Sequence, residues 1–266
     1  MYPILLSVGP LKIYSFGVFL ALATIIGAFT IWREGRQAKP ERFDEEKLVD
    51  LILVEALFGL IGARICYLIL HFEDFGFDFF RWLLIFHFPG LDFIGAIVGG
   101  VVGALVFAKK MGWSFCQVGD FLVLGISLGE VIGRIGAFLS GSAYGKLTTL
   151  PWGVPMVGLI GRRHPVQIYE AIVALLVFII LWRLKILIAN KKLQAGFLFL
   201  VYFLLFGVTK LFIEFFRGDS VYFDGWRVTQ IVCLVFIVTA VILLYKRLGR
   251  SVKTDILAIV RKVRYA

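Results

Sequence analysis

The sequence predicts an all-α polytopic membrane protein with about seven transmembrane helices. Hydrophobic residues make up 60% of its 266 residues, whereas a soluble domain is about 45–50% apolar, and the mean hydropathy is +0.92. Several apolar runs reach the roughly 20 residues that a helix needs to cross a bilayer. These runs are continuous rather than alternating, which favours helices over the strands of a β-barrel. The candidate spans are residues 13–32, 48–70, 92–108, 118–139, 166–187, 196–216 and 228–245.

The candidate spans differ in regularity. The third is short, and the fourth is interrupted by glycines and by Glu130 and Arg134. Residues 75–88, between the second and third spans, are rich in phenylalanine and too short to span. We expect this stretch to be interfacial or re-entrant, because aromatic side chains gather at the level of the lipid headgroups.

The distribution of basic residues predicts the orientation. The loops after the first, third and fifth spans, together with the C-terminal tail, carry more Lys and Arg than the alternate loops, and the richer set faces the cytoplasm. We therefore expect a periplasmic N-terminus, a cytoplasmic C-terminus and an extracytoplasmic loop at about residues 140–165. Residues 1–250 are expected to form one domain. The basic tail, residues 251–266, would be either an interfacial amphipathic helix or disordered.

Composition excludes several other classes. The net charge of +10 would suggest a nucleic-acid partner in a soluble protein, but here the basic residues flank apolar runs, as topology signals do. Cys66, Cys116 and Cys233 are scattered without metal-binding spacing. We expect no nucleic-acid partner, no metal and no cofactor. The N-terminus lacks a basic leader and a cleavage site, so we expect no removable signal peptide.

Charged residues inside or beside the spans are the candidates for chemistry. Arg134 lies in the stretch GRIGAFLSGSAYG, residues 133–145, at membrane depth, where an arginine costs about 2.5–3.5 kcal/mol on insertion scales. It should therefore face a protected cavity or an anionic partner. By the predicted topology, six such residues converge near the outer leaflet: Arg64, Arg134, His164, Glu170, Glu214 and Arg217.

Two interpretations of these charged residues are open. Several arginines oriented by carboxylates suit a phosphate group, and a ligand arriving from the bilayer would be a phospholipid. Alternatively the charges form structural ion pairs, Glu55 with Arg64 and Glu214 with Arg134. The sequence contains neither the GxSxG motif of a serine nucleophile nor the HExxH motif of a zinc site. If the protein is an enzyme, the attacking group must then belong to a second substrate.

Three motifs in order, GRIGAFLSGSAYG, HPVQIYE (residues 164–170) and FIEFFRGD (residues 212–219), resemble the prolipoprotein diacylglyceryl transferases of bacterial inner membranes. The shorter stretches KIYSFG, GARICY and PWGV support the resemblance, which covers nearly the whole chain. It implies transfer of the diacylglyceryl group of phosphatidylglycerol to the thiol of a lipobox cysteine in a prolipoprotein. The products would be a thioether and glycerol-1-phosphate, and the missing nucleophile would be that thiol, activated as a thiolate.

The resemblance also implies roles for individual residues. Arg134 and Arg217 would grip the phosphate and stabilise the charge that develops on it. The catalytic candidates are Arg134, Arg217, His164 and Glu170. The substrate-binding candidates are Arg134, Arg217, Tyr14, Arg64, Gln167, Gly133, Gly136, Gly145 and Glu214.

Two positions depart from the family pattern. Ala137 stands where many members have asparagine, and Ile94 stands where many have a histidine or tyrosine proposed to matter for catalysis. The thiol proton would then go to Glu170, Glu214, His164 or the phosphate, or else this copy is slow or inactive. The alternative functions are an impaired phospholipid-binding relative and an anion carrier. No inverted repeat of the kind found in carriers is evident.

Overall fold

The computed structural model describes residues 1–9, 11–38, 43–84, 87–88, 90–156, 158–188, 195–223 and 225–264. Within these ranges, seven helices are long and apolar enough to cross a membrane: Ser15–Ala38, Glu45–Leu70, Phe93–Lys110, Phe115–Ser140, Val166–Ile186, Phe197–Phe216 and Val228–Arg247. Each overlaps one of the seven predicted spans, and the third is the shortest, as expected. The prediction of an all-α multi-pass membrane protein is confirmed.

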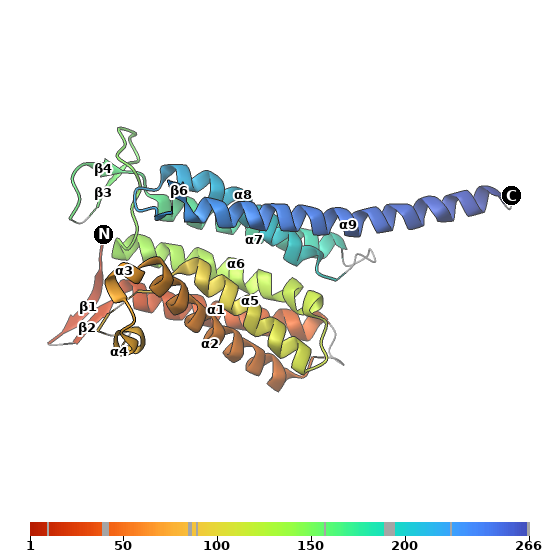
Figure 1. Ribbon diagram of the computed structural model, residues 1–266, viewed down its shortest axis with the longest axis horizontal. Coiled ribbons are helices and arrows are strands. Elements are labelled where there is room, and N and C mark those ends of the chain that lie inside the picture. Colours follow the sequence, from red (N-terminus) through yellow and green to blue (C-terminus); the bar gives the residue numbers. More distant parts are fainter. Residues whose placement is uncertain are drawn as a thin grey trace. The chain divides into compact units, whose positions relative to one another are not determined.

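Figure 1 labels the elements along the chain. The long helices are α1 (Ser15–Ala38), α2 (Glu45–Leu70), α5 (Phe93–Lys110), α6 (Phe115–Ser140), α7 (Val166–Ile188), α8 (Phe197–Ile213) and α9 (Val228–Arg264). The short helices are α3 (Phe72–Phe75), α4 (Phe79–Leu83) and the 3-10 turn η1 (Glu214–Phe216). Three antiparallel hairpins join β1 (Ile4–Val8) to β2 (Leu11–Tyr14), β3 (Val154–Pro155) to β4 (Arg162–Arg163), and β5 (Tyr222–Phe223) to β6 (Trp226–Arg227).

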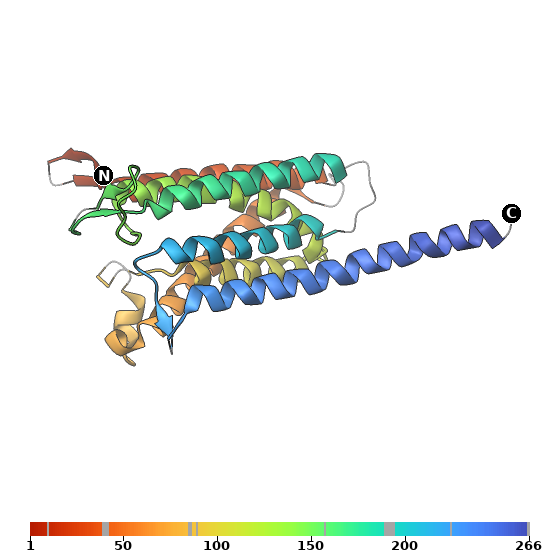
Figure 2. The same ribbon diagram turned by 90° about the horizontal axis from the view of Figure 1, so that it is seen from above.

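The described residues divide into two compact units, which pass into one another within α1 and α6. Unit 1 comprises Met1–Leu20 and Glu130–Ala266, and unit 2 comprises Ala21–Gly129. In unit 1, α8 packs between α7 and α9, and both ribbon views show α8 running alongside α9 (Figures 1 and 2). The tail beyond residue 250 continues α9 as helix to Arg264, while its side chains lie outside the described part. Whether the tail is amphipathic on a membrane stays a prediction.

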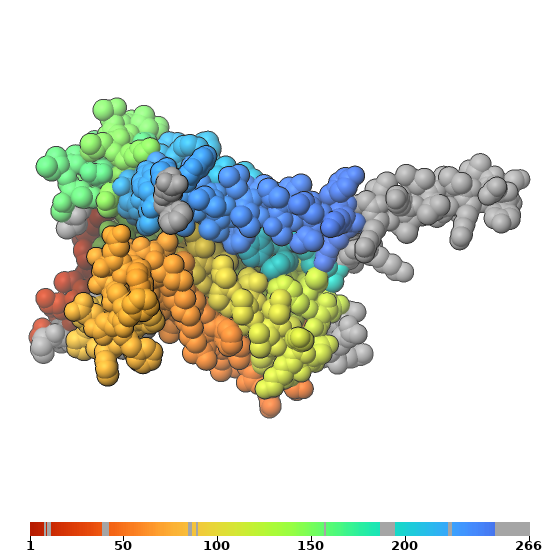
Figure 3. All heavy atoms as spheres, in the orientation of Figure 1, coloured from red at the N-terminus to blue at the C-terminus, as the bar shows by residue number. Residues whose placement is uncertain are grey.

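Unit 2 is built on a close contact between α2 and α5. A Cβ added to Gly62 would lie 2.4 Å from the carbonyl oxygen of Gly95, and one added to Gly99 would lie 2.2 Å from that of Phe58. Only glycine permits this approach, which is how membrane helices pack without a hydrophobic driving force. The predicted non-spanning stretch, residues 75–88, supplies α4 and the end of α3, and Figure 3 shows the orange α3–α4 segment at the C-terminal end of α2.

An N-terminal hairpin, which the sequence did not predict, is fastened to the helix ends of unit 1. The backbone amide of Tyr2 donates to the carbonyl of Leu139 at 2.9 Å, and that of Ser15 donates to the carbonyl of Pro3 at 2.9 Å. The hydroxyl of Ser15 also donates to the carbonyl of Tyr2. The hairpin therefore ties the C-terminal end of α6 to the N-terminal end of α1.

Candidate active site

Unit 1 contains a cluster of charged side chains supplied by α6, α7, α8, η1 and the segment that follows η1. Three are cations and four are carboxylates, and the most exposed side chain among them is only 23% accessible. The cluster consists of Glu130, Arg134, Glu170, Lys210, Glu214, Arg217 and Asp219. Burial of so many charges in an apolar bundle is costly unless they neutralise one another.

Glu170 lies at the centre of this cluster. Its side chain is 1% exposed, and its Oε2 lies 3.0 Å from Nη1 of Arg134. Its Oε1 accepts a hydrogen bond from Nζ of Lys210 at 2.9 Å and lies 3.5 Å from Nη1 of Arg217. One carboxylate from the first turn and a half of α7 thus contacts cations from three other parts of the fold, which are α6, α8 and the segment after η1.

Arg217 has a second, stronger carboxylate partner. Its Nε and Nη2 donate to Oδ1 and Oδ2 of Asp219 at 3.0 and 3.1 Å, a bidentate arrangement, and its Nε lies 3.9 Å from Oε2 of Glu214. Burial lowers the pKa of the Arg217 guanidinium, but the charges of Glu170, Asp219 and Glu214 outweigh that effect and raise the pKa above its usual value. Arg217 therefore remains a fixed positive charge.

The loop after α6 closes onto the Arg217 segment through Gly145. Residues Gly145 and Arg217 form an antiparallel bridge, and the amide of Lys146 donates to the carbonyl of Phe216 at 2.9 Å. A Cβ on Gly145 would lie 2.4 Å from the carbonyl oxygen of His164 and 3.0 Å from that of Phe216. The glycine predicted as a site residue is therefore required by close backbone packing.

His164 and its neighbours form an aromatic and polar rim beside this bridge. The His164 ring contacts the Phe216 ring, with centroids 5.2 Å apart, and its Nδ1 pairs with the hydroxyl of Tyr169 at 3.1 Å. The same hydroxyl accepts a hydrogen bond from Nε1 of Trp152 at 2.8 Å. His164 thus lies in a loop directly before Pro165, at the end of unit 1 that carries the cluster.

The remaining predicted site residues of unit 1 range from fully buried to exposed. Gln167 is fully buried and donates from Nε2 to the carbonyl of Ala143, so it holds the loop after α6. A Cβ on Gly136 would lie 2.4 Å from Cβ of Phe19, whereas one on Gly133 would meet no described atom within 4 Å. Tyr14 lies in β2 and is 57% exposed. Ligand binding by these residues stays a prediction.

Arg64 lies in unit 2 and is occupied by backbone. Its Nε donates to the carbonyl of Trp82 at 2.9 Å and its Nη2 to that of Arg81 at 2.8 Å. Its Nη1 donates to the carbonyls of Phe88 and Gly90 at 2.9 and 3.1 Å. In the described part of the chain, Arg64 therefore holds the segment after α2, in place of the ion pair with Glu55 that the sequence suggested. Its convergence with the other predicted residues stays a prediction.

The ion pair between Glu214 and Arg134 that the sequence suggested in unit 1 also needs correction. Arg134 pairs with Glu130 and Glu170, and Glu214 faces Arg217. Lys210 was not identified from the sequence. A signal for it exists, because Lys210, Glu214 and Arg217 follow one another at i, i+4 and i+7, which places three charges on one face of an otherwise apolar helix and its extension.

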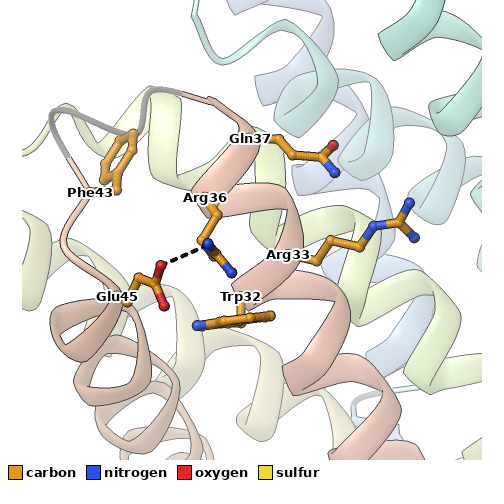
Figure 4. Close-up of a pocket in the computed structure, with 6 residues that line it drawn as sticks. All are labelled: Trp32, Arg33, Arg36, Gln37, Phe43 and Glu45. Carbon is orange, nitrogen blue, oxygen red and sulfur yellow. Dashed lines mark ion pairs between the residues drawn. The ribbon is translucent and has the colours of Figure 1, made fainter.

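A separate hollow of about 380 Å³ lies in unit 2, at the junction of α1 and α2. Figure 4 shows Arg36 reaching across the hollow to Glu45, with the two side chains 2.9 Å apart. The Arg36 guanidinium also lies 4.8 Å from the centre of the Trp32 ring. Both partners of this ion pair are about half exposed, so it contributes little energy, and nothing in it suggests chemistry.

The fold and the cluster together define a multi-pass helical membrane protein with a buried site of arginines and carboxylates. The family model for prolipoprotein diacylglyceryl transferase matches residues 3–246, so the chain belongs to that family.

Curated relatives agree with this assignment. A phosphatidylglycerol–prolipoprotein diacylglyceryl transferase of Finegoldia magna is 29% identical over 249 residues, covering 94% of this chain and 97% of the relative. Proteins of the same name from Trichormus variabilis and a Nostoc species are 31% and 32% identical, over 87% of this chain and 84% of each relative. The likeness therefore extends over most of the length of each relative.

Proposed function

We propose that the protein transfers the diacylglyceryl group of phosphatidylglycerol to the thiol of a lipobox cysteine in a prolipoprotein. This is the first step of lipoprotein maturation, and we place it in the bacterial inner membrane with the cluster near the outer leaflet. The observation that carries the proposal is that Arg134 and Arg217 are both held by one buried carboxylate, Glu170, in a membrane-spanning unit. Membership of the family and the names of the relatives support it.

The reaction requires one bond to form and one to break. The thiolate sulfur attacks the glyceryl CH₂ carbon that carries the phosphate ester, forming a C–S bond. The C–O bond to phosphate breaks, and glycerol-1-phosphate leaves with the electron pair. The thiol proton must pass to an acceptor, since the thiolate and not the thiol is the nucleophile.

Arg134 and Arg217 are assigned to the phosphate. Negative charge grows on the phosphate oxygens as the C–O bond breaks, and guanidinium groups fixed beforehand stabilise that charge without reorganisation. Glu170 positions both guanidiniums, through contacts of 3.0 and 3.5 Å. A phosphate oxygen that approached the same pair of arginines would meet donors already oriented by a carboxylate.

Glu214 is the proton acceptor that the geometry favours among the four candidates. It is buried, its Oε1 has no hydrogen-bond partner among the described residues, and its Oε2 lies 3.9 Å from Arg217. Glu170, by contrast, is in contact with three cations, and His164 pairs with Tyr169.

A pH series tests the role of Glu214. In Glu214→Gln the thiol must ionise without help, so activity should fall at neutral pH and recover as pH approaches about 8.5, the ordinary pKa of a cysteine thiol. Glu214→Asp serves as the conservative control. A flat ratio of variant to wild-type activity across that range would assign the proton to another group.

The proposed function itself is tested with purified protein in liposomes, phosphatidylglycerol and a synthetic lipobox peptide. We expect release of glycerophosphate together with a peptide mass increase of one diacylglyceryl group, and loss of both in Arg134→Ala and Arg217→Ala. The exposed Arg81, whose side chain is 49% accessible, supplies the control Arg81→Ala, which should leave activity unchanged.

Two other results would redirect the assignment. Phosphatidylglycerol retained by the protein without product would make the chain a binding relative, and Ile94 and Ala137 would then be the suspects for its lost chemistry. Movement of an anion across sealed vesicles without product would favour the carrier.

A further inference from the structure

Lys210 is a buried charge that neither the motifs nor the proposed reaction accounts for. It is the one charged residue among the 17 of α8, whose sequence is FLFLVYFLLFGVTKLFI, and it is 8% exposed. Lys210 lies in the last turn of α8, yet its side chain is buried, and ionisable residues buried within membrane helices are rare and usually have a functional role. The question is what this lysine does in the cluster.

The contacts of Lys210 connect two carboxylates that also hold Arg134. Its Nζ lies 2.9 Å from Oε1 of Glu130 and 2.9 Å from Oε1 of Glu170. Arg134 faces the same two residues, at 3.4 Å from Glu130 and 3.0 Å from Glu170. The ammonium of Lys210 is thus nearer to Glu130 than the guanidinium of Arg134 is.

The charge balance of the cluster depends on this lysine. Three cations face four carboxylates, and without Lys210 only Arg134 and Arg217 would remain to face the same four. A phosphodiester brings a further negative charge, and interactions between charges are strong where water is excluded. Each uncompensated carboxylate would therefore repel the lipid headgroup and compete with it for the arginines.

We propose that Lys210 is a positioning residue that neutralises Glu130 and Oε1 of Glu170, and so keeps Arg134 available to the phosphate of the lipid substrate. Glu130 and Lys210 form a charge-balancing pair in this proposal. Glu130 and Glu170 already face the guanidinium of Arg134, at 3.4 and 3.0 Å. Without the ammonium to share their charge, both carboxylates bind that guanidinium more strongly and compete with the phosphate for its donors. The inference rests on the proposed transferase function.

The primary test is Lys210→Met, which keeps the length of the side chain and removes its charge. With phosphatidylglycerol as the varied substrate and the lipobox peptide in excess, we expect KM to rise at least tenfold, with kcat changed by less than threefold. Lys210→Arg keeps the charge and should remain within fivefold of wild type in KM. The matched control is Lys110→Met, at an exposed lysine at the end of α5, which should behave as wild type.

A second substitution separates charge balance from packing. In Lys210→Met combined with Glu130→Gln, one carboxylate is removed along with the cation, so KM should recover at least fivefold relative to Lys210→Met alone. A lysine that only filled space or supported the helix would not be rescued by a change on α6. In this double variant the side chain at residue 130 carries no charge, so the loss of Lys210 leaves no uncompensated carboxylate there. The double variant is assayed directly if Lys210→Met does not accumulate as folded protein.

The outcomes are distinct. A KM within twofold of wild type in Lys210→Met would overturn the inference, as would a folded double variant no more active than Lys210→Met or a folded Lys210→Arg without activity. Wild-type protein that makes no thioether would instead overturn the proposed function. Rescue by Glu130→Gln, with active wild type, would establish the charge-balancing pair.

Discussion

Each of the two units of the protein holds an arginine that is mostly shielded from solvent, Arg64 buried and Arg134 14% exposed. The two arginines have different kinds of partner. Arg64 in unit 2 donates to four backbone carbonyls, those of Arg81, Trp82, Phe88 and Gly90. Arg134 in unit 1 faces the side-chain carboxylates of Glu130 and Glu170. From sequence alone both arginines are charges within membrane spans and both are candidates for binding the substrate, although only Arg134 is also a catalytic candidate.

The kind of partner decides what each arginine can do. The carbonyls that accept from Arg64 belong to one local segment, and losing the guanidinium would remove four part-buried hydrogen bonds that hold this segment. Carboxylates that face Arg134 are charges that orient the guanidinium, and an incoming anion can share its donors. Arg64 is therefore expected to act on stability, and Arg134 on substrate.

The largest effect is expected for Glu170→Gln in unit 1. Its carboxylate contacts Arg134, Lys210 and Arg217, and breaking a buried ion pair from one side costs about 3–5 kcal/mol because a charge is left uncompensated. We expect both a lower free energy of unfolding and loss of transferase activity. The measurements are chemical unfolding in detergent and the liposome assay. A stable, active variant would show that the cluster does not depend on its central carboxylate.

Substitution of Lys for Arg at matched positions tests the comparison directly. Arg134→Lys and Arg217→Lys keep the charge but lose the fork that grips a phosphate, so kcat/KM should fall about 100-fold, equivalent to about 2.7 kcal/mol. Arg64→Lys loses several hydrogen bonds to carbonyls and should lower the free energy of unfolding by about 2 kcal/mol, with KM for phosphatidylglycerol unchanged. If Arg64→Lys instead raises the KM for phosphatidylglycerol and leaves the free energy of unfolding unchanged, then Arg64 acts on the substrate and the contrast with Arg134 is wrong.

A smaller effect separates two glycines of the same motif. A Cβ on Gly145 would clash with the carbonyl oxygens of His164 and Phe216, whereas one on Gly133 meets no described atom within 4 Å. Gly145→Ala should therefore destabilise unit 1 by about 1–3 kcal/mol, the usual cost of overpacking, and Gly133→Ala should be neutral or slightly stabilising in its helix. Thermal unfolding of the two variants, compared side by side, measures the difference. Equal midpoints would contradict the close packing at Gly145.

Much of the fold could be predicted because lipid imposes a simple requirement. Only a continuous apolar helix satisfies its backbone in hydrocarbon, so all seven spans follow from runs of residues that the sequence displays. The N-terminal hairpin did not follow, since it depends on backbone hydrogen bonds from Tyr2 and Ser15 to distant partners.

The sequence predicted most members of the charged cluster, but it did not predict which carboxylate pairs with which cation. Arg134, Glu170, Glu214 and Arg217 are together in one cluster, but which carboxylate faces which cation depends on how the helices are rotated. Lys210 was not predicted because it lies two residues before the FIEFFRGD motif, although its spacing from Glu214 and Arg217 places it on the same face. The backbone carbonyls that Arg64 contacts could not be predicted from the sequence, and a role for Arg64 in substrate binding stays a prediction.

The smallest effect is expected at Ile94, at the start of α5 in unit 2, where the helix is capped by Asp92, whose carboxylate accepts from the amide of Gly95 at 2.9 Å. The resemblance described above implies a histidine or tyrosine at this place, so Ile94→His would supply a group able to accept a proton. If Glu214 accepts the thiol proton, the added imidazole duplicates an existing function, and kcat should rise by less than threefold. Ile94→Gln, similar in size but without a titrating group, is the control. A gain of tenfold or more in Ile94→His alone would move part of the chemistry into unit 2, because a proton acceptor must lie within hydrogen-bond reach of the thiol that it activates.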